Sequence, residues 1–333
     1  QDLNDFLLPD SLVVVESTVE PGFVENIFIP IVEGKDKKLE AGKSFGIGVC
    51  PETANPGEIL KDFQTLPRLV GSINKKSSEI ISLIYDHVFP VDLIQMPNCK
   101  TANAVKLTTN VFRDVNIAFV NELALLFEKL NIDIFTVLDA AKTKYNFQIH
   151  YPGCGVGGPC LPVNSYQIIH SAKALSPNLS RLVRTAREIN EQMPFHTLDL
   201  LKDALKSIGQ TIENSTIGIL GVSYKPNVKD IQLSPAEKII SELKELGCTI
   251  KIYDPYFISS NIFTINTENN SDDVIKNSDA ILVLTAHKEF FSIQPEIFSR
   301  LMKKPIVVDT RNLFDPSKLY ELQIIYRGIG RSN

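Results

Sequence analysis

The chain has 333 residues, of which 44% are hydrophobic and 22% charged, and its formal net charge at pH 7 is -5. This length allows two or three domains with a sizeable core, and basic residues scattered among acidic ones argue against nucleic-acid binding. No apolar stretch reaches transmembrane length, the first residues do not resemble a signal peptide, and the five cysteines form no CxxC pair. We therefore expect a cytoplasmic protein that binds neither membrane nor nucleic acid.

The first predicted elements are those of an open α/β sheet. Residues 11–16 (SLVVVE) and 45–50 (FGIGVC) are short apolar runs typical of buried strands in a parallel sheet. Thr18 and Glu52 follow these strands, at the end where open α/β sheets bind ligands. The simpler interpretation makes Thr18 a helix N-cap and Glu52 a solvated surface charge. A helix is predicted next, over residues 78–89.

The longest predicted helix covers residues 101 to about 130, a stretch without Pro or Gly whose apolar residues keep helical spacing. Lys106 and Asn110 are four residues apart in it, so both side chains leave the same face. A lysine and an amide that converge on one atom suit a site where an oxyanion develops. By base rate alone, a helix lysine is more often an exposed surface residue. Residues 131–143 predict another helix.

Residues 151–166 (YPGCGVGGPCLPVNSY) place four glycines, at 153, 155, 157 and 158, just before Cys160, with Pro159 and Pro162 on either side of the thiol. Glycine lacks the Cβ that keeps other groups away from the backbone, so we expect a shaped loop that a substrate or cofactor can approach. Cys160 is then a nucleophile at the edge of that surface. Taken alone, the pattern fits a tight turn around a buried cysteine equally well.

The last third alternates strand and helix signals. After a predicted helix pair at residues 177–201, strand signals recur within residues 215–220, 249–254, 279–287 and 305–310, with helical segments between them. This alternation is typical of a doubly wound sheet.

Several strings match one family in order. GVGGPCLPVN around Cys160 resembles the GVGGxCxPxD signature of the UDP-glucose/GDP-mannose dehydrogenase family, and the helix at 101–130 resembles its KLxxN…RDVNIAxxNE helix. Shorter matches are STVEPG at 17–22, CPE at 50–52, PRLVGS at 67–72, AREINEQMP at 186–194 and DTRN at 309–312. Within the family, the match is nearest to the enzymes that act on UDP-N-acetyl-D-mannosamine.

The resemblance implies an α/β protein with a Rossmann-like domain at each end and an all-helical region between them that forms a homodimer or a higher homo-oligomer. The expected domains are an NAD-binding part at 1–96, a helical dimerisation and catalytic part at 97–205, and a UDP-sugar-binding part at 206–333. No G-x-G-x-x-G dinucleotide fingerprint occurs before the first strand. We therefore expect the N-terminal part of the NAD-binding domain to be missing, which leaves open whether the chain turns over by itself.

The implied activity is an NAD-dependent, four-electron oxidation of the C6 hydroxyl of a UDP-sugar, without a metal, through a thiohemiacetal and a thioester on Cys160. Lys106 and Asn110 would stabilise the oxyanion. Thr18, Glu52 and Asn164 would attend the hydrolytic water. Because an amide cannot take a proton, either Glu52 is the base or hydrolysis is slow, and we expect Glu52 to be the base.

The resemblance also implies binding residues. It assigns substrate binding to Arg113, Gly157, Lys225 and Arg311, and cofactor binding to Thr18, Glu52 and Gln232. For Arg311 the simpler interpretation is a surface ion pair.

The sequence departs from the family pattern at four positions. Thr53 and Gln232 stand where the family has arginine, and Asn103 and Asn164 stand where it has an acidic residue.

Three alternatives stay open. The substrate could be UDP-glucose or UDP-N-acetylglucosamine. A one-step β-hydroxyacid dehydrogenase also has a lysine and an asparagine four residues apart on a central helix, but needs no Cys160. The chain could also be a truncated, non-catalytic dimer that binds UDP-sugars.

Overall fold

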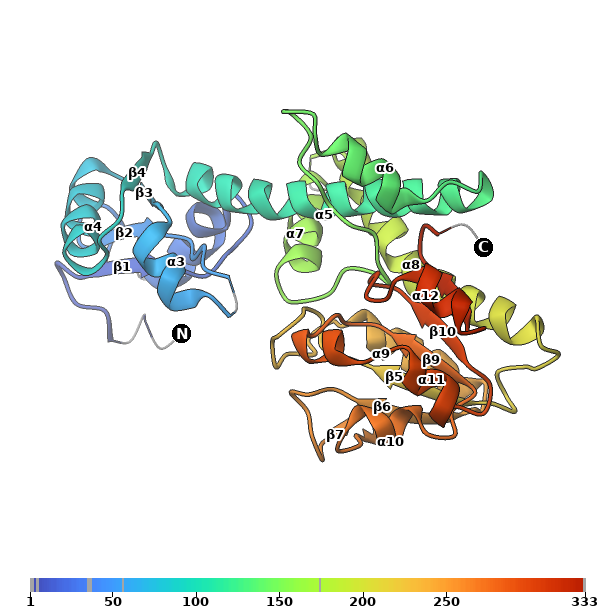
Figure 1. Ribbon diagram of the computed structural model, residues 1–333. Helices are drawn as coiled ribbons and strands as arrows, with labels where there is room; N and C mark the ends of the chain where they lie inside the picture. The colour runs from blue at the N-terminus through green and yellow to red at the C-terminus, as the bar shows by residue number, and fades with distance from the viewer. Residues whose placement is uncertain (1–2, 4–5, 35–37, 56, 174, 332–333) are drawn as a thin grey trace. The chain divides into compact units, whose positions relative to one another are not determined.

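The computed structural model describes residue 3 and residues 6–34, 38–55, 57–173 and 175–331 (Figure 1). The chain divides into two compact units, the first with Gln1–Phe112 and Val163–Val183 and the second with Arg113–Pro162 and Arg184–Asn333. Both units combine a sheet with helices, so the expected α/β class is confirmed.

The first unit contains a four-stranded sheet of order β1-β2-β3-β4. Its strands are β1 (Leu12–Val15), β2 (Gly46–Val49), β3 (Arg68–Ser72) and β4 (Leu93–Met96). The pairs β1–β2 and β3–β4 are parallel, but β3 runs antiparallel to β2. The first residue of β3 therefore lies at the same edge of the sheet as the last residue of β2.

Helices and an irregular turn of π-helix complete the first unit. They are η1 (Val24–Phe28), α2 (Ile29–Glu33), α3 (Ile59–Thr65), α4 (Lys75–Val88), most of α7 (Leu161–Lys173), and the 3-10 turn η2 (Pro177–Ser180). α4 packs on the sheet through Ile81 and Tyr85, which join Cys50 and Val70 in one core cluster. It begins three residues before the prediction because Asn74 caps it, accepting from the N–H of Ser77 at 2.8 Å.

The predicted central helix is α5 (Cys99–Lys129), a continuous helix of 31 residues whose residues belong to both units. The shorter α6 (Ile134–Ala141) follows, capped by Asp133, which accepts from the N–H of Phe135 at 2.7 Å. α8 (Arg181–Lys206) is 26 residues long.

The second unit carries a parallel five-stranded sheet of order β11-β10-β9-β5-β6. The strands are β5 (Thr216–Leu220), β6 (Thr249–Tyr253), β9 (Ala280–Val283), β10 (Ile306–Asp309) and β11 (Ile325–Gly328), with a small pair β7 (Asn261–Ile262) and β8 (Ile265–Asn266). Its helices are α9 (Pro235–Glu245), α10 (Ser271–Ile275), α11 (Glu296–Leu301), α12 (Pro316–Glu321) and the 3-10 turn η3 (Lys288–Ser292).

Alternate residues of this sheet belong to different cores. Ala280 and Leu282 of β9 pack in one cluster with α8 and α9, whereas Ile281 and Val283 pack in another with α10, α11 and α12. Successive strand residues point to opposite faces, so both faces are covered by helices, as in the doubly wound sheet predicted from the sequence.

Residues 151–160 form the expected loop, but the helical end of the stretch was not predicted. α7 begins at Leu161, so Asn164 lies on a helix and not in the loop. Pro162 is tolerated there because the first N–H groups of a helix have no partner within it.

None of the helices in the described part of the chain is both long and apolar enough to span a membrane.

Candidate active site

Two predicted site residues follow neighbouring strands of the first unit. Thr18 comes three residues after β1 and Glu52 three residues after β2, and these strands are parallel. Parallel strands present their carboxyl ends at one edge, so both loops leave the sheet together. The N–H of Glu52 donates to the carbonyl of Glu16 at 3.1 Å, which joins the two loops directly.

Three donors hold the Glu52 carboxylate. Oε1 accepts from the N–H groups of Thr53 and Ala54 at 2.6 and 2.7 Å, and Oε2 accepts from Nη2 of Arg68 at 3.1 Å. Thr53 therefore contributes a backbone bond at the position where the related pattern has an arginine side chain.

The position of Arg68 follows from the antiparallel pairing of β2 and β3. Gly48 pairs with Ser72 and Val49 with Gly71, and the same register, continued beyond the strands, brings Arg68 opposite Glu52. Arg68 is not among the predicted site residues, although it belongs to the matched string PRLVGS. The missing signal was strand direction, which periodicity alone does not provide.

Arg68 is 3% exposed and lies in an aromatic cage. Its guanidinium is 4.0 Å from the ring centroid of Phe89 and 5.4 Å from those of Phe63 and Tyr85. A second carboxylate, that of Glu16, lies 3.7 Å away and also accepts from the hydroxyl of Tyr85. Aromatic faces attract a guanidinium, so the cage holds this charge in place beside two acids.

On α5, Lys106 is half-buried and Asn110 is 8% exposed. Nδ2 of Asn110 donates to Oδ1 of Asn164 on α7 at 2.6 Å, and Asn164 is itself 4% exposed. The structure thus brings together two of the predicted residues, which are 54 positions apart in the chain.

In the second unit, the open space expected over the glycine loop is filled by protein on the side where each Cβ would be. A Cβ at Gly157 would lie 2.5 Å from the carbonyl of Leu233, and one at Gly158 would lie 2.5 Å from the ring of Tyr224. Gly158 also has φ +87°, which favours glycine. These glycines therefore let the loop pack against the segment before α9.

Cys160, the last residue of this loop, is an exposed free thiol, whereas Cys50, Cys99 and Cys154 are buried. Burial raises the pKa of Tyr224, and the nearby Asp230 and Cys160 raise it further while Arg113 lowers it. Cys160 and the exposed Arg113 thus both lie near this tyrosine.

The loop that carries Lys225 is anchored by a buried acid. Oδ2 of Asp254 accepts from the N–H groups of Val222 and Ser223 at 2.8 and 3.1 Å and lies 3.0 Å from Nε2 of His287. The N–H of Asn227 donates to Nδ1 of His287 at 2.9 Å. Nδ1 is therefore an acceptor, and the proton of this imidazole is on Nε2, facing Asp254.

Arg311 and Gln232 lie against the same glycine loop. Nε of Arg311 donates to the carbonyl of Leu284 at 2.7 Å, and its Nη2 lies 3.4 Å from Sγ of Cys154. Gln232 is exposed, and its carbonyl accepts from the N–H of Gly158 at 2.9 Å.

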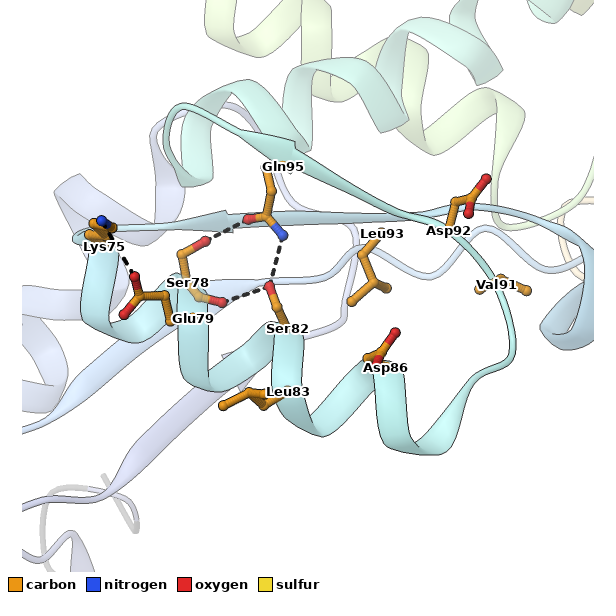
Figure 2. A pocket seen from close by; sticks show the side chains of 10 residues that line it. All are labelled: Lys75, Ser78, Glu79, Ser82, Leu83, Asp86, Val91, Asp92, Leu93 and Gln95. Atoms are coloured by element: carbon orange, nitrogen blue, oxygen red, sulfur yellow. Dashed lines mark hydrogen bonds and ion pairs between the residues drawn. The ribbon is translucent and has the colours of Figure 1, made fainter.

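A hollow of about 870 Å³ lies elsewhere, between α4 and β4 (Figure 2). It is lined in part by Ser78, Ser82 and Gln95, which form a hydrogen-bonded row, and by Leu83 and Asp86. No predicted site residue lines it. It is open and of mixed polarity, so we assign it no role in the chemistry.

Family profiles match three successive parts of the chain. Residues 1–89 match the NAD binding domain of the UDP-glucose/GDP-mannose dehydrogenase family, residues 100–192 its central domain and residues 218–316 its UDP binding domain. The first match overturns the expectation that the N-terminal part of the NAD-binding domain is missing. Residues 1–89 carry that domain's pattern without a G-x-G-x-x-G string.

Relatives resemble the chain along nearly its whole length. It is 33% identical to the UDP-N-acetyl-D-mannosamine dehydrogenase of Methanocaldococcus jannaschii over 95% of this chain and 69% of that protein. The structure of the Pyrococcus horikoshii enzyme of the same name superposes with a TM-score of 0.89 at 32% identity, covering 99% of this chain and 75% of the other. The Staphylococcus aureus UDP-N-acetyl-mannosamine dehydrogenase gives 0.83 at 30% identity, covering 98% and 74%.

Proposed function

This chain belongs to the UDP-glucose/GDP-mannose dehydrogenase family, and from that membership we propose that it oxidises the C6 hydroxyl of UDP-N-acetyl-D-mannosamine to a carboxylate. The observation that carries the proposal is the exposed thiol of Cys160 within a GVGGPCLP string, in a chain similar to mannosamine dehydrogenases over 95% of its length. NAD, when bound, accepts a hydride in each of the two oxidation steps.

The edge of the first sheet suits this cofactor. The carboxyl ends of β1 and β2 bring the loops of Thr18 and Glu52 together, which is the part of an open α/β sheet that binds dinucleotides. We assign cofactor contacts to these two residues and to Gln232. The proposed domains are residues 1–96 for NAD, 97–205 for dimerisation and catalysis, and 206–333 for the UDP-sugar.

We assign the role of the covalent nucleophile to Cys160. As a thiolate it adds to the C6 aldehyde, and oxidation of the resulting thiohemiacetal leaves a thioester. Lys106 and Asn110 stabilise the oxyanion with a charge and an amide N–H.

Water then hydrolyses the thioester. We assign the base to Glu52, whose carboxylate is fixed by three donors, because Asn164 cannot accept a proton. Thr18 lies in the loop joined to that of Glu52 and is assigned to the hydrolytic water.

Substrate binding is assigned to Arg113, Gly157, Lys225 and Arg311. Lys225 offers a point charge to a phosphate oxygen, and its loop is fixed by the buried pair of Asp254 and His287. Arg311 can present a planar fork to a carboxylate or phosphate.

We further propose a homodimer that acts in the cytoplasm. Exposed apolar residues recur every seven positions along α5, at Val105, Phe112, Phe119 and Leu126. A stripe with this period is typical of a helix that packs against another helix, and five free thiols suit a reducing compartment.

NADH yield tests the function. The protein, incubated with excess NAD and limiting UDP-N-acetyl-D-mannosamine, should form two NADH per sugar, and Cys160→Ser should not complete the second oxidation. One NADH per sugar would instead indicate a one-step dehydrogenase. If calorimetry shows that the sugar nucleotide binds but no NADH is formed, the chain is a non-catalytic binding protein. Repeating the assay with UDP-glucose and UDP-N-acetylglucosamine tests which UDP-sugar is the substrate.

The base assignment has its own test. Glu52→Gln should form the Cys160 thioester in a single turnover but hydrolyse it slowly, so that intact-protein mass spectrometry detects the adduct. Absence of the adduct in that variant would argue against Glu52 as the base.

A further inference from the structure

Four residues of the first unit form a continuous chain of hydrogen bonds. Asn110 Nδ2 donates to Asn164 Oδ1 at 2.6 Å, Asn164 Nδ2 donates to Gln167 Oε1 at 3.0 Å, and Gln167 Nε2 donates to the carbonyl of Thr18 at 3.3 Å. Every bond runs in the same direction, from an amide N–H to the next carbonyl oxygen. The chain links α5, α7 and the loop after β1.

Because residue 164 is an amide, the series of hydrogen bonds must continue beyond it. A carboxylate there could only accept, but an amide accepts with its oxygen and must also place its N–H donors. Because Asn164 is 4% exposed, water cannot replace a missing partner, and an unbonded N–H would destabilise the folded protein. Gln167 lies three residues later on α7, on the same helix face, and its Oε1 takes that donor.

The first link also orients Asn110. Its Nδ2 carries two hydrogens, and the bond to Asn164 takes one of them and fixes the plane of the amide. The second hydrogen then points in a fixed direction. At the other end of the series, Gln167 donates to the carbonyl of Thr18 and so holds the backbone there.

We propose that Asn164 and Gln167 are positioning residues that together replace a carboxylate. Asn164 orients the amide of Asn110 by accepting a hydrogen bond from it. Gln167 accepts the remaining hydrogen bond from Asn164 and holds the loop of Thr18 by donating to its carbonyl. This inference rests on the proposed function, in which Asn110 stabilises the oxyanion and Thr18 attends the hydrolytic water. Asn164 is then a hydrogen-bond link with no part in proton transfer.

Two substitutions at residue 167 distinguish the effect of its bond to Asn164 from the effect of its bond to Thr18. Gln167→Met removes both bonds of residue 167. Gln167→Glu keeps an acceptor for Asn164 but cannot donate to the carbonyl of Thr18. Gln95→Met is the matched control, because Gln95 also bonds two partners, Ser78 and Ser82, but beside the hollow of Figure 2.

The experiment measures thioester formation and thioester hydrolysis separately, by rapid quench and mass spectrometry, together with KM and the melting temperature. Gln167→Met should slow both steps about tenfold, the rate equivalent of one hydrogen bond, with KM within about twofold. Gln167→Glu should slow hydrolysis by a similar factor and leave thioester formation within about twofold. Gln95→Met should change neither rate.

The Asn164→Asp variant, used as a second background, tests whether Asn164 and Gln167 together replace a carboxylate. Asn164→Asp still accepts from Asn110 and no longer needs an acceptor from residue 167. In the Asn164→Asp protein, Gln167→Met should therefore leave thioester formation unchanged, which a double-mutant cycle detects as coupling.

Two results would overturn the inference: equal rates for Gln167→Met and Gln95→Met, or the same rate profile for Gln167→Met and Gln167→Glu. Failure of the proposed function looks different, because the wild-type protein would then form no thioester with any UDP-sugar.

Discussion

Nη2 of Arg68 lies 3.1 Å from Oε2 of Glu52, although the two residues are 16 positions apart in the chain. The buried guanidinium stands in a cage of three aromatic rings with a second acid beside it. One of the three donors that orient the Glu52 carboxylate is therefore a cation that is anchored independently of it.

Arg68→Met should destabilise the protein by about 2–3 kcal/mol in urea unfolding, because it removes a hydrogen bond to a carboxylate and the aromatic contacts of the guanidinium. Arg68→Lys should recover only part of this, since an ammonium cannot reproduce the planar fork. The matched control is Lys61→Met, which breaks an exposed pair with Glu58 and should cost less than about 0.5 kcal/mol. Equal losses for Arg68→Met and Lys61→Met would contradict this account.

Cysteine reactivity should be confined to one position at neutral pH. Burial raises the pKa of Cys99 to about 12 and that of Cys248 to about 11, so at pH 8 about one in a thousand of these thiols or fewer is ionised. Iodoacetamide should therefore modify the exposed Cys160 first, as peptide mass spectrometry would show. Rapid modification of Cys99 in the folded protein would contradict this.

The same pKa shift predicts alkaline destabilisation. Unfolded thiols ionise near pH 8.5, while folded Cys99 keeps its proton to about pH 12. The unfolded state thus loses protons first, and the free energy of unfolding should fall as pH rises from about 8.5, by at most ~1.4 kcal/mol per pH unit for this thiol. Cys99→Ala should reduce that slope in urea titrations at several pH values, and Cys160→Ala should not.

Asp254 should contribute to acid stability. Burial alone would raise its pKa, but the hydrogen bond from His287, with bonds from backbone N–H groups, brings the pKa below its usual value. Stability from this group is present above the unfolded pKa of about 3.9 and is lost as pH falls through the lower folded value. Asp254→Asn should cost about 2–4 kcal/mol at pH 7 and flatten the acid transition.

Asp315→Asn is the control for that experiment. Asp315 also has a lowered pKa, from its bonds to Ser317, but it is an exposed helix cap, and because asparagine caps a helix as well as aspartate does, Asp315→Asn should change the stability little. Because Asp254 anchors the Lys225 loop, Asp254→Asn should weaken UDP binding in calorimetry and Asp315→Asn should not.

Two asparagines of α5 should respond in opposite ways to the same change. Both polar side-chain atoms of Asn103, Oδ1 and Nδ2, are buried without a hydrogen-bond partner in the described part of the chain. Asn121 is equally buried but donates to Asn190 at 2.9 Å and accepts from the N–H of Gly153 at 3.0 Å. Asn103→Leu should stabilise the protein by about 1–2 kcal/mol and Asn121→Leu should destabilise it by about 2–3 kcal/mol. Thermal unfolding of the pair measures the difference, and a loss in both variants would show that Asn103 has a polar partner in solution.

The exposed stripe of α5 tests the proposed dimer. Phe119→Asp with Leu126→Asp should shift the protein toward monomer in sedimentation velocity, because charges in an apolar helix contact are left without partners. Leu83→Asp on α4, where the leucine is 73% exposed, is the matched control and should leave the sedimentation coefficient unchanged. Dissociation by Leu83→Asp alone would count against the α5 contact.

Periodicity predicted most elements because it reports which side of a helix or strand is buried. The helix predicted for residues 101 to about 130 is α5, which runs over Cys99–Lys129, and the strands predicted at 11–16 and 45–50 are β1 and β2. The start of α7 is not predicted because proline is typical of loops, although it is compatible with the first turn of a helix, where Pro162 lies.

Contacts between distant segments could not be predicted in the same way. The bonds of Arg68 to Glu52 and of Gln167 to Thr18 depend on strand direction and on helix packing, which leave no local pattern in the sequence. The family resemblance identified the positions of Asn110 and Asn164, but not the amide chain that joins them.

The antiparallel join of β2 and β3 also bears on protein engineering. The pairing of these strands sets the register that carries Arg68 to Glu52, and a slip of one residue would turn every side chain of β3 to the other face. The exposed residues 57 and 58, which precede α3 in the connection between these strands, are outside that register. Insertions should be accepted there and rejected within β3.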